Sequence, residues 1–277
     1  MGTTEFRYEK LTWPEINEAA RAGKLILIPT AAIEDHGYHL PLDTDVMLTT
    51  GVCRRAAERL PDQVLLMPPV LHGYLPHHAD FPGGITIGWK TFVDYGLDIT
   101  RSLTHHGFRR ILLINGHGSN RPLVEMIARL TIVERPDVLC AAASWWEMQR
   151  VREVVETTFD SKVMSHACEL ETSVYLALDP GKVQMDKTRP DVEAYRMSPH
   201  VWSNLPGLKP DPSLRNAVSM MEYWSVISET GTRGDPTTAT KQKGEAVIEA
   251  AAAEIADIVR ELQARPIRPR VDHHRLG

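Results

Sequence analysis

A stretch of acidic and imidazole side chains, Glu34–Asp45, reads Glu-Asp-His-Gly-Tyr-His-Leu-Pro-Leu-Asp-Thr-Asp. It follows the apolar run Leu25–Pro29, which is typical of a buried strand. In open α/β sheets, ligands bind beyond the carboxyl ends of the strands. In an extended segment Glu34 and His36 point to the same side. Together with Asp45 they offer the oxygen and nitrogen ligands of a divalent metal, so we interpret the stretch as a metal site rather than a polar surface loop.

A second group of polar residues, Asn115-Gly-His-Gly-Ser-Asn120, comes directly after another apolar run. The glycines on either side of His117 allow the backbone to turn sharply and to present the imidazole to a crevice. The alternative is a glycine-rich phosphate loop. The spacing matches neither Gly-x-Gly-x-x-Gly nor a P-loop, and the stretch has no lysine.

The third group is His166-x-x-Glu169-x-Glu171. If this stretch is helical, His166 and Glu169 lie three residues apart on one face and can reach the same site. Glu171 then points to a different side of the helix, so the two glutamates are expected to have different roles. The alternative is an acidic first turn that the helix dipole favours.

The elements that must position these groups alternate between strands and helices. Strands are predicted at 25–29, 64–67, 110–115 and 138–143, and helices at 13–22, 46–60, 91–106, 121–134, 166–178 and 244–262, with another ending near 157. The first helix has the capping-box signature Thr12-x-x-Glu15. This order predicts an α/β fold with a mostly parallel sheet and helices on both faces. We expect one domain spanning residues 1–277.

The composition excludes several classes of protein. The 277 residues are 43% hydrophobic and 24% charged, with a net charge of −5, and this composition is ordinary for a soluble globular protein. Without a basic stripe or a polybasic run, neither nucleic acid nor a membrane surface is expected as a partner. Three widely spaced cysteines suggest no disulfide framework. No apolar run has the length of a membrane span and no signal peptide is visible, so we expect a cytoplasmic protein.

Taken together, the sequence resembles the creatininase (creatinine amidohydrolase) family. The matching stretches keep the family's order and cover nearly the whole chain: 28–45, 78–83, 115–120, 166–173 and 231–236. The resemblance implies a three-layer α/β/α sandwich and a site with two divalent metal ions, which we expect to be zinc, with manganese and iron as alternatives. It also implies a homo-oligomer, since creatininase is a hexamer.

The resemblance also implies roles for individual residues. Glu34 and His117 would hold one metal, His36 the other, and Asp45 would bridge them. In creatininase a glutamate two positions after the motif histidine completes the second site, but Ser119 stands there in this chain. Glu169 is the expected replacement ligand, with Glu171 as the alternative. His166 matches the catalytic histidine, and the expected neighbours of the site are His78, Ser119, Trp145, Trp146 and Glu171.

The implied activity is hydrolysis of a C–N bond in a small polar amide, cyclic amide or formamide. Two cations bridged by a carboxylate lower the pKa of a shared water, and the resulting hydroxide attacks a polarised carbonyl. His166 would give a proton to the leaving nitrogen. One alternative is that the same site hydrolyses a C–C or lactone-like bond of a cyclic ketone, such as an inosose-type sugar derivative. A third reading is a non-catalytic binding protein.

One long segment, 184–212, is rich in proline and has no steady period. A loop of this length in a compact domain is usually functional. We expect it to form a lid over the site or an arm between subunits.

Overall fold

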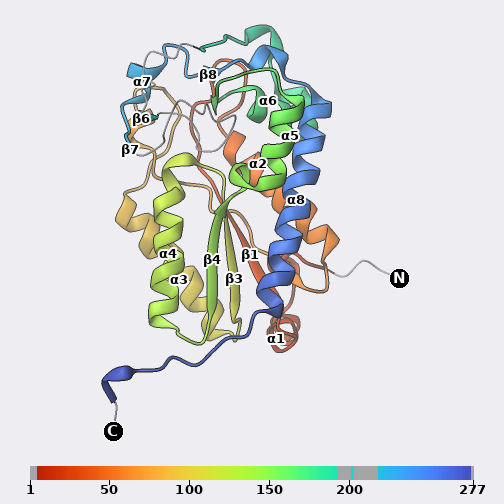
Figure 1. The fold of residues 1–277 in the computed structure, drawn as a ribbon, viewed down its shortest axis with the longest axis vertical. Coiled ribbons are helices and arrows are strands. Elements are labelled where there is room, and N and C mark those ends of the chain that lie inside the picture. The colour runs from red at the N-terminus through yellow and green to blue at the C-terminus, as the bar shows by residue number, and fades with distance from the viewer. Residues whose placement is uncertain (1–4, 193–200, 203–217, 276–277) are drawn as a thin grey trace.

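The central sheet has four parallel strands in the order β2-β1-β3-β4. The structure is a computed structural model that describes residues 5–192, 201–202 and 218–275 (Figure 1). Strand β1 spans Leu25–Thr30, β2 Val64–Leu66, β3 Arg110–Asn115 and β4 Leu139–Ser144. All six residues of β1 are buried, as expected for an apolar strand covered on both faces. The strands agree with the predicted ones to within a residue or two.

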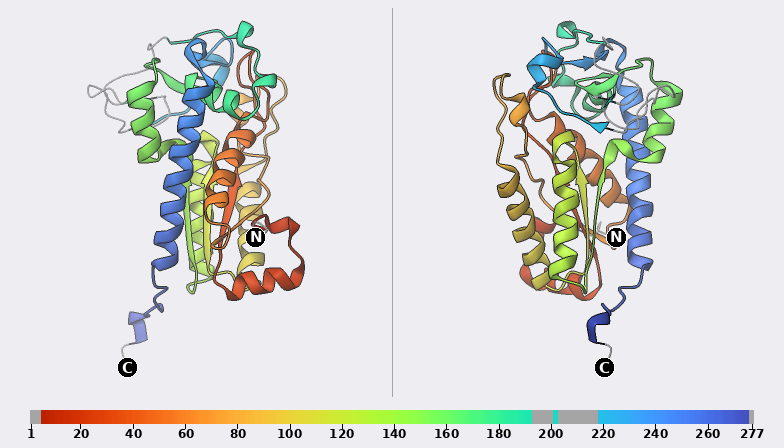
Figure 2. Two further views of the ribbon diagram at one scale, coloured as in Figure 1. Left: turned by 90° about the vertical axis from the view of Figure 1, so that its right-hand side faces the viewer. Right: turned by 60° about the vertical axis from the view of Figure 1, so that its left-hand side comes forward.

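Helices cover both faces of this sheet (Figures 1 and 2). Helices α3 (Trp89–His105) and α4 (Arg121–Glu134) pack on one face, where they form an apolar core with α1 (Trp13–Arg21). A second core on the other face holds the apolar sides of α2 (Thr44–Arg59), α5 (Gln149–Thr158), α6 (Glu169–Leu178) and α8 (Lys241–Ala264). The predicted α/β/α arrangement with a mostly parallel sheet is therefore confirmed.

The predicted cap of α1 is present. The Glu15 carboxylate accepts the backbone N–H of Thr12 at 2.7 Å, and this bond satisfies a donor that the first helical turn leaves free. Among the described residues, no helix is both long enough and apolar enough to cross a membrane. Cys53, Cys140 and Cys168 are free thiols.

The segment before α6 differs from the prediction. Residues 164–166 form the short strand β5 (Met164–His166), which pairs antiparallel with β8 (Arg233–Gly234). The helix predicted at 166–178 begins only at Glu169. Between the two elements Ala167 has φ 48°, a left-handed conformation that turns the chain from the strand into the helix. His166 and Glu169 therefore do not share a helical face.

The predicted lid or arm at 184–212 lies largely outside the described residues, which omit 193–200 and 203–217. Its first part is a short helical turn, Met185–Lys187, followed by a bridge in which the Asp191 N–H donates to Gly234 O at 2.9 Å. Val201–Trp202 forms β6, which pairs with β7 (Val218–Ser219). The lid or arm stays a prediction.

Helix α8 can approach α6 closely because position 244 is a glycine. A Cβ atom at Gly244 would overlap the backbone carbonyl of Ser173. Gly244→Ala should therefore lower the free energy of unfolding by about 2 to 3 kcal/mol, since overpacking against backbone outweighs the higher helix propensity of alanine. Urea unfolding would measure this loss. The control is Gly181→Ala, whose Cβ would meet only Asp179 Oδ1 at 3.5 Å; equal losses in both variants would contradict the close approach.

Candidate metal centre

The first two groups of polar residues lie together because they follow neighbouring parallel strands. The last residues of β1 and β3 are paired, Thr30 with Asn115. Glu34 follows four residues after Thr30, and His117 two residues after Asn115. Both side chains therefore leave the sheet at the same edge, which is the edge where ligands bind in open α/β sheets. His117 Nδ1 lies 3.0 Å from Glu34 Oε1.

Local hydrogen bonds hold His117 in place. The Asn115 side chain accepts the His117 N–H at 3.1 Å and donates to the His117 carbonyl at 2.8 Å. Between them, a Cβ atom at Gly116 would overlap Thr49 Oγ1. The glycine thus allows α2 to lie directly against the loop that carries the imidazole.

Two further carboxylates come from the first turns of helices. Asp45 lies in the first turn of α2 and Glu171 in the first turn of α6, and both are buried. The partial positive charge at a helix N-terminus stabilises a carboxylate there. The fold thus gathers two strand ends and two helix starts around a single point.

Ligand-type atoms of the described residues form four close triads, of which two include His166 and the other two share Asp45. The two triads that share Asp45 are the ones considered as metal sites. In the first, His117 Nδ1 lies 3.2 Å from Asp45 Oδ2 and 3.0 Å from Glu34 Oε1. In the second, His36 Nε2 lies 3.4 Å from Asp45 Oδ1 and 4.0 Å from Glu171 Oε2. Asp45 therefore presents one carboxylate oxygen to each triad, as a bridging ligand would.

The polar atoms of the two triads are incompletely satisfied. Within the described part of the chain, four buried atoms of these triads make no hydrogen bond: Glu34 Oε2, His36 Nε2, Asp45 Oδ2 and Glu171 Oε2. Buried polar atoms normally have partners, so unpaired ligand-type atoms around one point are suited to bind a cation. The side chains present therefore fit a pair of divalent metal ions.

The electrostatics of the site also favour positive charge. Burial lowers the pKa of His36, but Asp45, Glu171 and Glu34 outweigh burial and raise that pKa to about 10. Burial likewise lowers the pKa of His117, and Glu34 and Asp45 more than reverse this. Burial raises the pKa of Glu171, which His36 and His166 only partly oppose. The carboxylates thus favour positive charge at this point, which a pair of divalent cations would supply.

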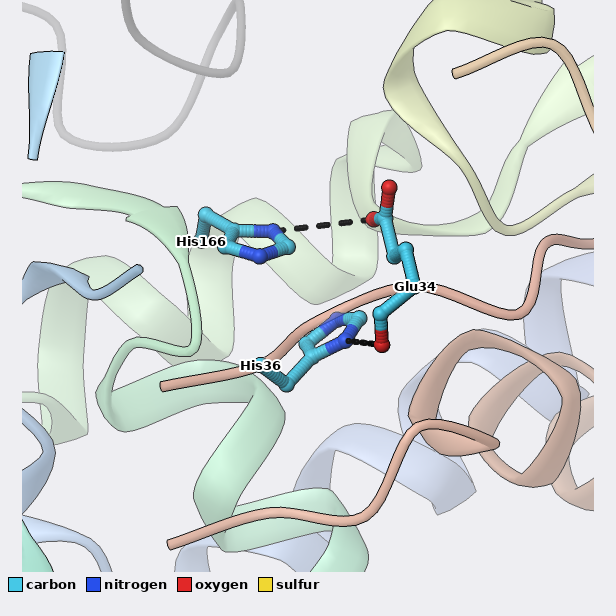
Figure 3. Close-up of side chains that lie close together, drawn as sticks. All are labelled: Glu34, His36 and His166. Atoms are coloured by element: carbon cyan, nitrogen blue, oxygen red, sulfur yellow. Dashed lines mark hydrogen bonds and ion pairs between the residues drawn. The ribbon is translucent and has the colours of Figure 1, made fainter. Parts of the chain in front are cut away.

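His166 lies beside the triads at the end of β5 (Figure 3). Its Nδ1 is 3.7 Å from Glu34 Oε1, and its ring centroid is 4.2 Å from that of His36. The other ring nitrogen, Nε2, lies 2.6 Å from the carbonyl oxygen of Asp35. A carbonyl only accepts, so Nε2 carries a proton and Nδ1 faces the carboxylates.

The structure also places two residues at the site that the sequence analysis did not single out. Asp35 is buried, and its Oδ1 lies 2.8 Å from His78 Nδ1. Trp224, in the short helix α7 (Trp224–Ile227), stacks on His78 with ring centroids 4.8 Å apart and meets His166 edge-on at 4.9 Å. Asp35 lies within the acidic and imidazole stretch Glu34–Asp45. In contrast, no periodic pattern around Trp224 indicates a functional site.

Glu169 is not in the metal-ligand cluster, which corrects the prediction that it completes the second metal site. Its fully buried carboxylate accepts the backbone N–H groups of Asp160 and Ser161, at 3.1 and 2.7 Å, and forms an ion pair with Lys243. Because α6 begins at Glu169, this side chain points toward the preceding loop. Glu171, two residues later, occupies the position expected of the ligand.

The remaining predicted neighbours differ in their placement. His78 Nε2 lies 3.6 Å from Glu34 Oε2, at the edge of the cluster. Ser119 Oγ lies 3.2 Å from His77 Nε2 and belongs to neither triad. Trp145 and Trp146 are buried in the core on the α8 face. They therefore contribute to core packing, and neither belongs to the two triads.

The sequence is similar to known proteins over most of its length. The family model "Creatininase: Creatinine amidohydrolase" matches residues 9–259. The chain is 30% identical over 267 residues to creatinine amidohydrolase of Pseudomonas putida, and the match covers 91% of this chain and 95% of that protein. It is 33% identical over 243 residues to mycofactocin precursor peptide peptidase of Mycobacterium tuberculosis, with 85% and 83% coverage.

Solved structures of creatininases have a similar fold. A solved structure described as "Creatininase Mn" superimposes with a TM-score of 0.74 and 28% sequence identity, over 93% of this chain and 98% of that one. The structure of a mutant creatininase described as "Zn-Zn type" superimposes with the same TM-score and identity. The likeness therefore extends over the described scaffold and the loops that carry the two triads.

The two glutamates of α6 should respond differently to substitution. Glu171→Gln should bind one metal equivalent fewer, because it removes a ligand from the second triad. Glu169→Gln should keep full metal content but lower the free energy of unfolding by about 3 kcal/mol, as expected when a buried ion pair is broken. Metal analysis of dialysed protein and urea unfolding would measure the two effects.

The two variants serve as matched controls because they neutralise carboxylates in the same helical turn. Loss of a metal equivalent in Glu169→Gln, with full metal content in Glu171→Gln, would reverse the assignment made here.

Proposed function

The chain belongs to the creatininase family, and we propose that it is a metal-dependent amidohydrolase. The proposed reaction is hydrolysis of a C–N bond in a small polar amide, cyclic amide or formamide. The observation that supports it most directly is the pair of triads joined by Asp45, with unpaired ligand atoms in both. A binding protein would need neither this arrangement nor a histidine beside it.

Each triad would hold one divalent cation. Glu34, His117 and one oxygen of Asp45 would hold the first, and His36, Glu171 and the other oxygen the second. When bound, such a pair polarises a substrate carbonyl and lowers the pKa of a nearby water. None of the six side chains at the centre, His166 included, is more than 8% exposed, so the scaffold keeps bulk water away and strengthens each charge interaction.

His166 is the proposed proton donor to the leaving nitrogen. The Asp35 carbonyl holds Nε2, and Trp224 packs edge-on against the ring, so the proton that moves is the one on Nδ1. Burial and the charge of His36 lower the pKa of His166, while Asp35, Glu34 and Glu171 raise it above its ordinary value.

Alternative substrates share this machinery. The relative named a peptide peptidase favours, as a second candidate, an amide within a short peptide. Hydrolysis of a cyclic ketone stays a prediction, since ligands that polarise a carbonyl do not determine which neighbouring bond breaks. A screen of amides, formamides, short peptides and cyclic ketones, with zinc, manganese or iron added back, would separate these classes. The homo-oligomer and the cytoplasmic location also stay predictions.

His166→Ala should lower kcat by about 100-fold or more, the usual contribution of a general acid. Metal content should stay near that of the unchanged protein, because His166 is assigned to proton transfer rather than to ligation. Turnover of a substrate found in the screen and metal analysis of the same sample would check both statements.

Two controls accompany this variant. Asp45→Ala should lose metal together with activity, because it removes the bridge, and the exposed His105→Ala should change neither. If His166→Ala lost one metal equivalent, His166 would be a ligand and not the acid.

Creatinine should be a poor substrate. Ser119 lies against His77 and outside both triads, while Glu171 approaches the second triad from α6. In creatininase the corresponding carboxylate follows the motif histidine. We therefore expect the open side of the second triad to differ between this chain and creatininase. We expect creatinine turnover well below about 10 s⁻¹, an ordinary kcat for an enzyme on its own substrate. Ser119→Glu should not restore it, because Glu171 already fills the site.

Release of creatine from creatinine, followed with each metal, would measure this. Turnover at or above that value in the unchanged protein would contradict the first statement. Efficient turnover in Ser119→Glu alone would contradict the second, and Ser119→Ala controls for loss of the hydroxyl.

A further inference from the structure

The free edge of β4 is an open groove. Strand β4 is the near edge of the sheet in Figure 1, where it lies between α4 and α8. Its first five residues are only partly buried, although they belong to the central sheet. None of the described residues forms a strand on its outer side.

The opposite edge of the sheet is protected. Strand β2 has only three residues, and the N-terminal segment lies beside it, with Phe6 O accepting the Leu66 N–H at 2.7 Å. Short strands and covering segments are the usual ways to prevent edge pairing, as are charged residues, prolines and bulges. Strand β4 reads Leu-Cys-Ala-Ala-Ala-Ser, pairs with β3 without a bulge, and has none of these features.

The register shows which backbone groups are free to pair. Leu139 N–H donates to Arg109 O at 2.9 Å, and Leu139 is paired with Arg110. In a parallel ladder, alternate residues direct both backbone groups to the same neighbour. Residues 139, 141 and 143 therefore bond to β3, and Cys140, Ala142 and Ser144 direct their N–H and C=O groups into the groove.

Two clefts follow this edge. The upper one, of about 400 Å³, is lined by Ala142–Ser144 together with two arginines and three glutamates: Arg121, Arg152, Glu125, Glu147 and Glu254. The lower one, of about 480 Å³, is lined by Val138–Ala141 with one glutamate and two arginines: Glu261, Arg265 and Arg270. The upper end thus carries a charge of −1 and the lower end +1.

We propose that this groove binds β4 of a second copy of the chain, so that two sheets join into one antiparallel eight-stranded sheet. The two-fold axis passes through the middle of β4 and places the acidic upper end of each groove against the basic lower end of its partner. On the α8 face, Glu254 lies toward the partner's Arg265. The charges of the groove are therefore complementary to themselves under this symmetry.

The outward backbone groups limit the register. Hydrogen-bonded pairs must join outward residues of both copies, so the two-fold axis passes through residue 141 or 142. In the first case Ala142 exchanges hydrogen bonds with the partner's Cys140, and in the second with the partner's Ala142. In both registers the Ala142 N–H donates across the interface. The exposed Ile132 on α4 lines the lower cleft and adds apolar area.

Ala142→Pro tests the proposal, because proline removes this outward N–H and leaves the hydrogen bonds to β3 intact. Sedimentation velocity of the full chain over a range of concentrations should show self-association in the unchanged protein. The dissociation constant should rise at least about 10-fold in Ala142→Pro, which loses one donor in each copy. Ala142→Ser keeps the N–H and should associate like the unchanged protein.

Three results would overturn the proposal: an unchanged protein that is monomeric at about 50 μM, equal association by Ala142→Pro and the unchanged protein, or equal weakening by proline and serine. A monomer would leave the groove to an extended segment of another protein.

Hydrogen exchange on the unchanged protein gives a second test if the proline variant fails to fold. The amides of Cys140 and Ala142 should be protected in the assembly and lose protection on dilution, while that of Ala141, bonded to β3, stays protected throughout. Rapid exchange at Ala142 while the protein is associated would show that copies meet elsewhere.

Discussion

The structure depends on burying six ionisable side chains at one edge of the sheet. They are three carboxylates and three imidazoles: Glu34, Asp45, Glu171, His36, His117 and His166. An isolated charge in such a place is strongly unfavourable, so each must have a partner of opposite sign. Asp45 provides this for both halves of the site, because one oxygen faces His117 and the other faces His36. A shift of Asp45 would remove one counter-charge from each of two buried imidazoles and leave His117 with Glu34 alone and His36 with the more distant Glu171. The position of α2 is therefore constrained by electrostatics as well as by apolar packing.

The scaffold meets this constraint with few elements. The in-register pairing of β1 and β3 brings Glu34 and His117 to the same level. The first turns of α2 and α6, two helices that pack in the same core, then add carboxylates that the helix dipoles stabilise. At Gly116, the absence of a side chain permits the contact between α2 and the loop after β3. The geometry of the site is thus largely a consequence of strand register and of where two helices begin.

The sheet and the positions of Glu34 and His117 could be predicted from the sequence. Apolar runs mark the strands, and polar residues directly after parallel strands must lie at the same edge of the sheet. The contribution of α6 could not be predicted in the same way. Periodicity locates a helix but not its first residue, and a shift of three residues decides which glutamate faces the site. Ala167 ends the strand that carries His166 without any glycine or proline to mark the break. Trp224 reaches the site only through tertiary packing, which no local pattern encodes.

Glu169 explains how Glu171, the proposed ligand on α6, is held in a fixed position. Its carboxylate ties the first residue of the helix to the backbone at Asp160 and Ser161, and Lys243 at the start of α8 balances its charge. This buried pair fixes both the position and the rotation of the helix, and Glu171 follows within the same turn. A residue that does not touch the site thereby determines where its last carboxylate points. The loop after β3 carries the small Ser119 and no carboxylate. In the proposed site, Glu171 on α6 supplies that carboxylate instead, and the contacts of Glu169 hold α6 in place.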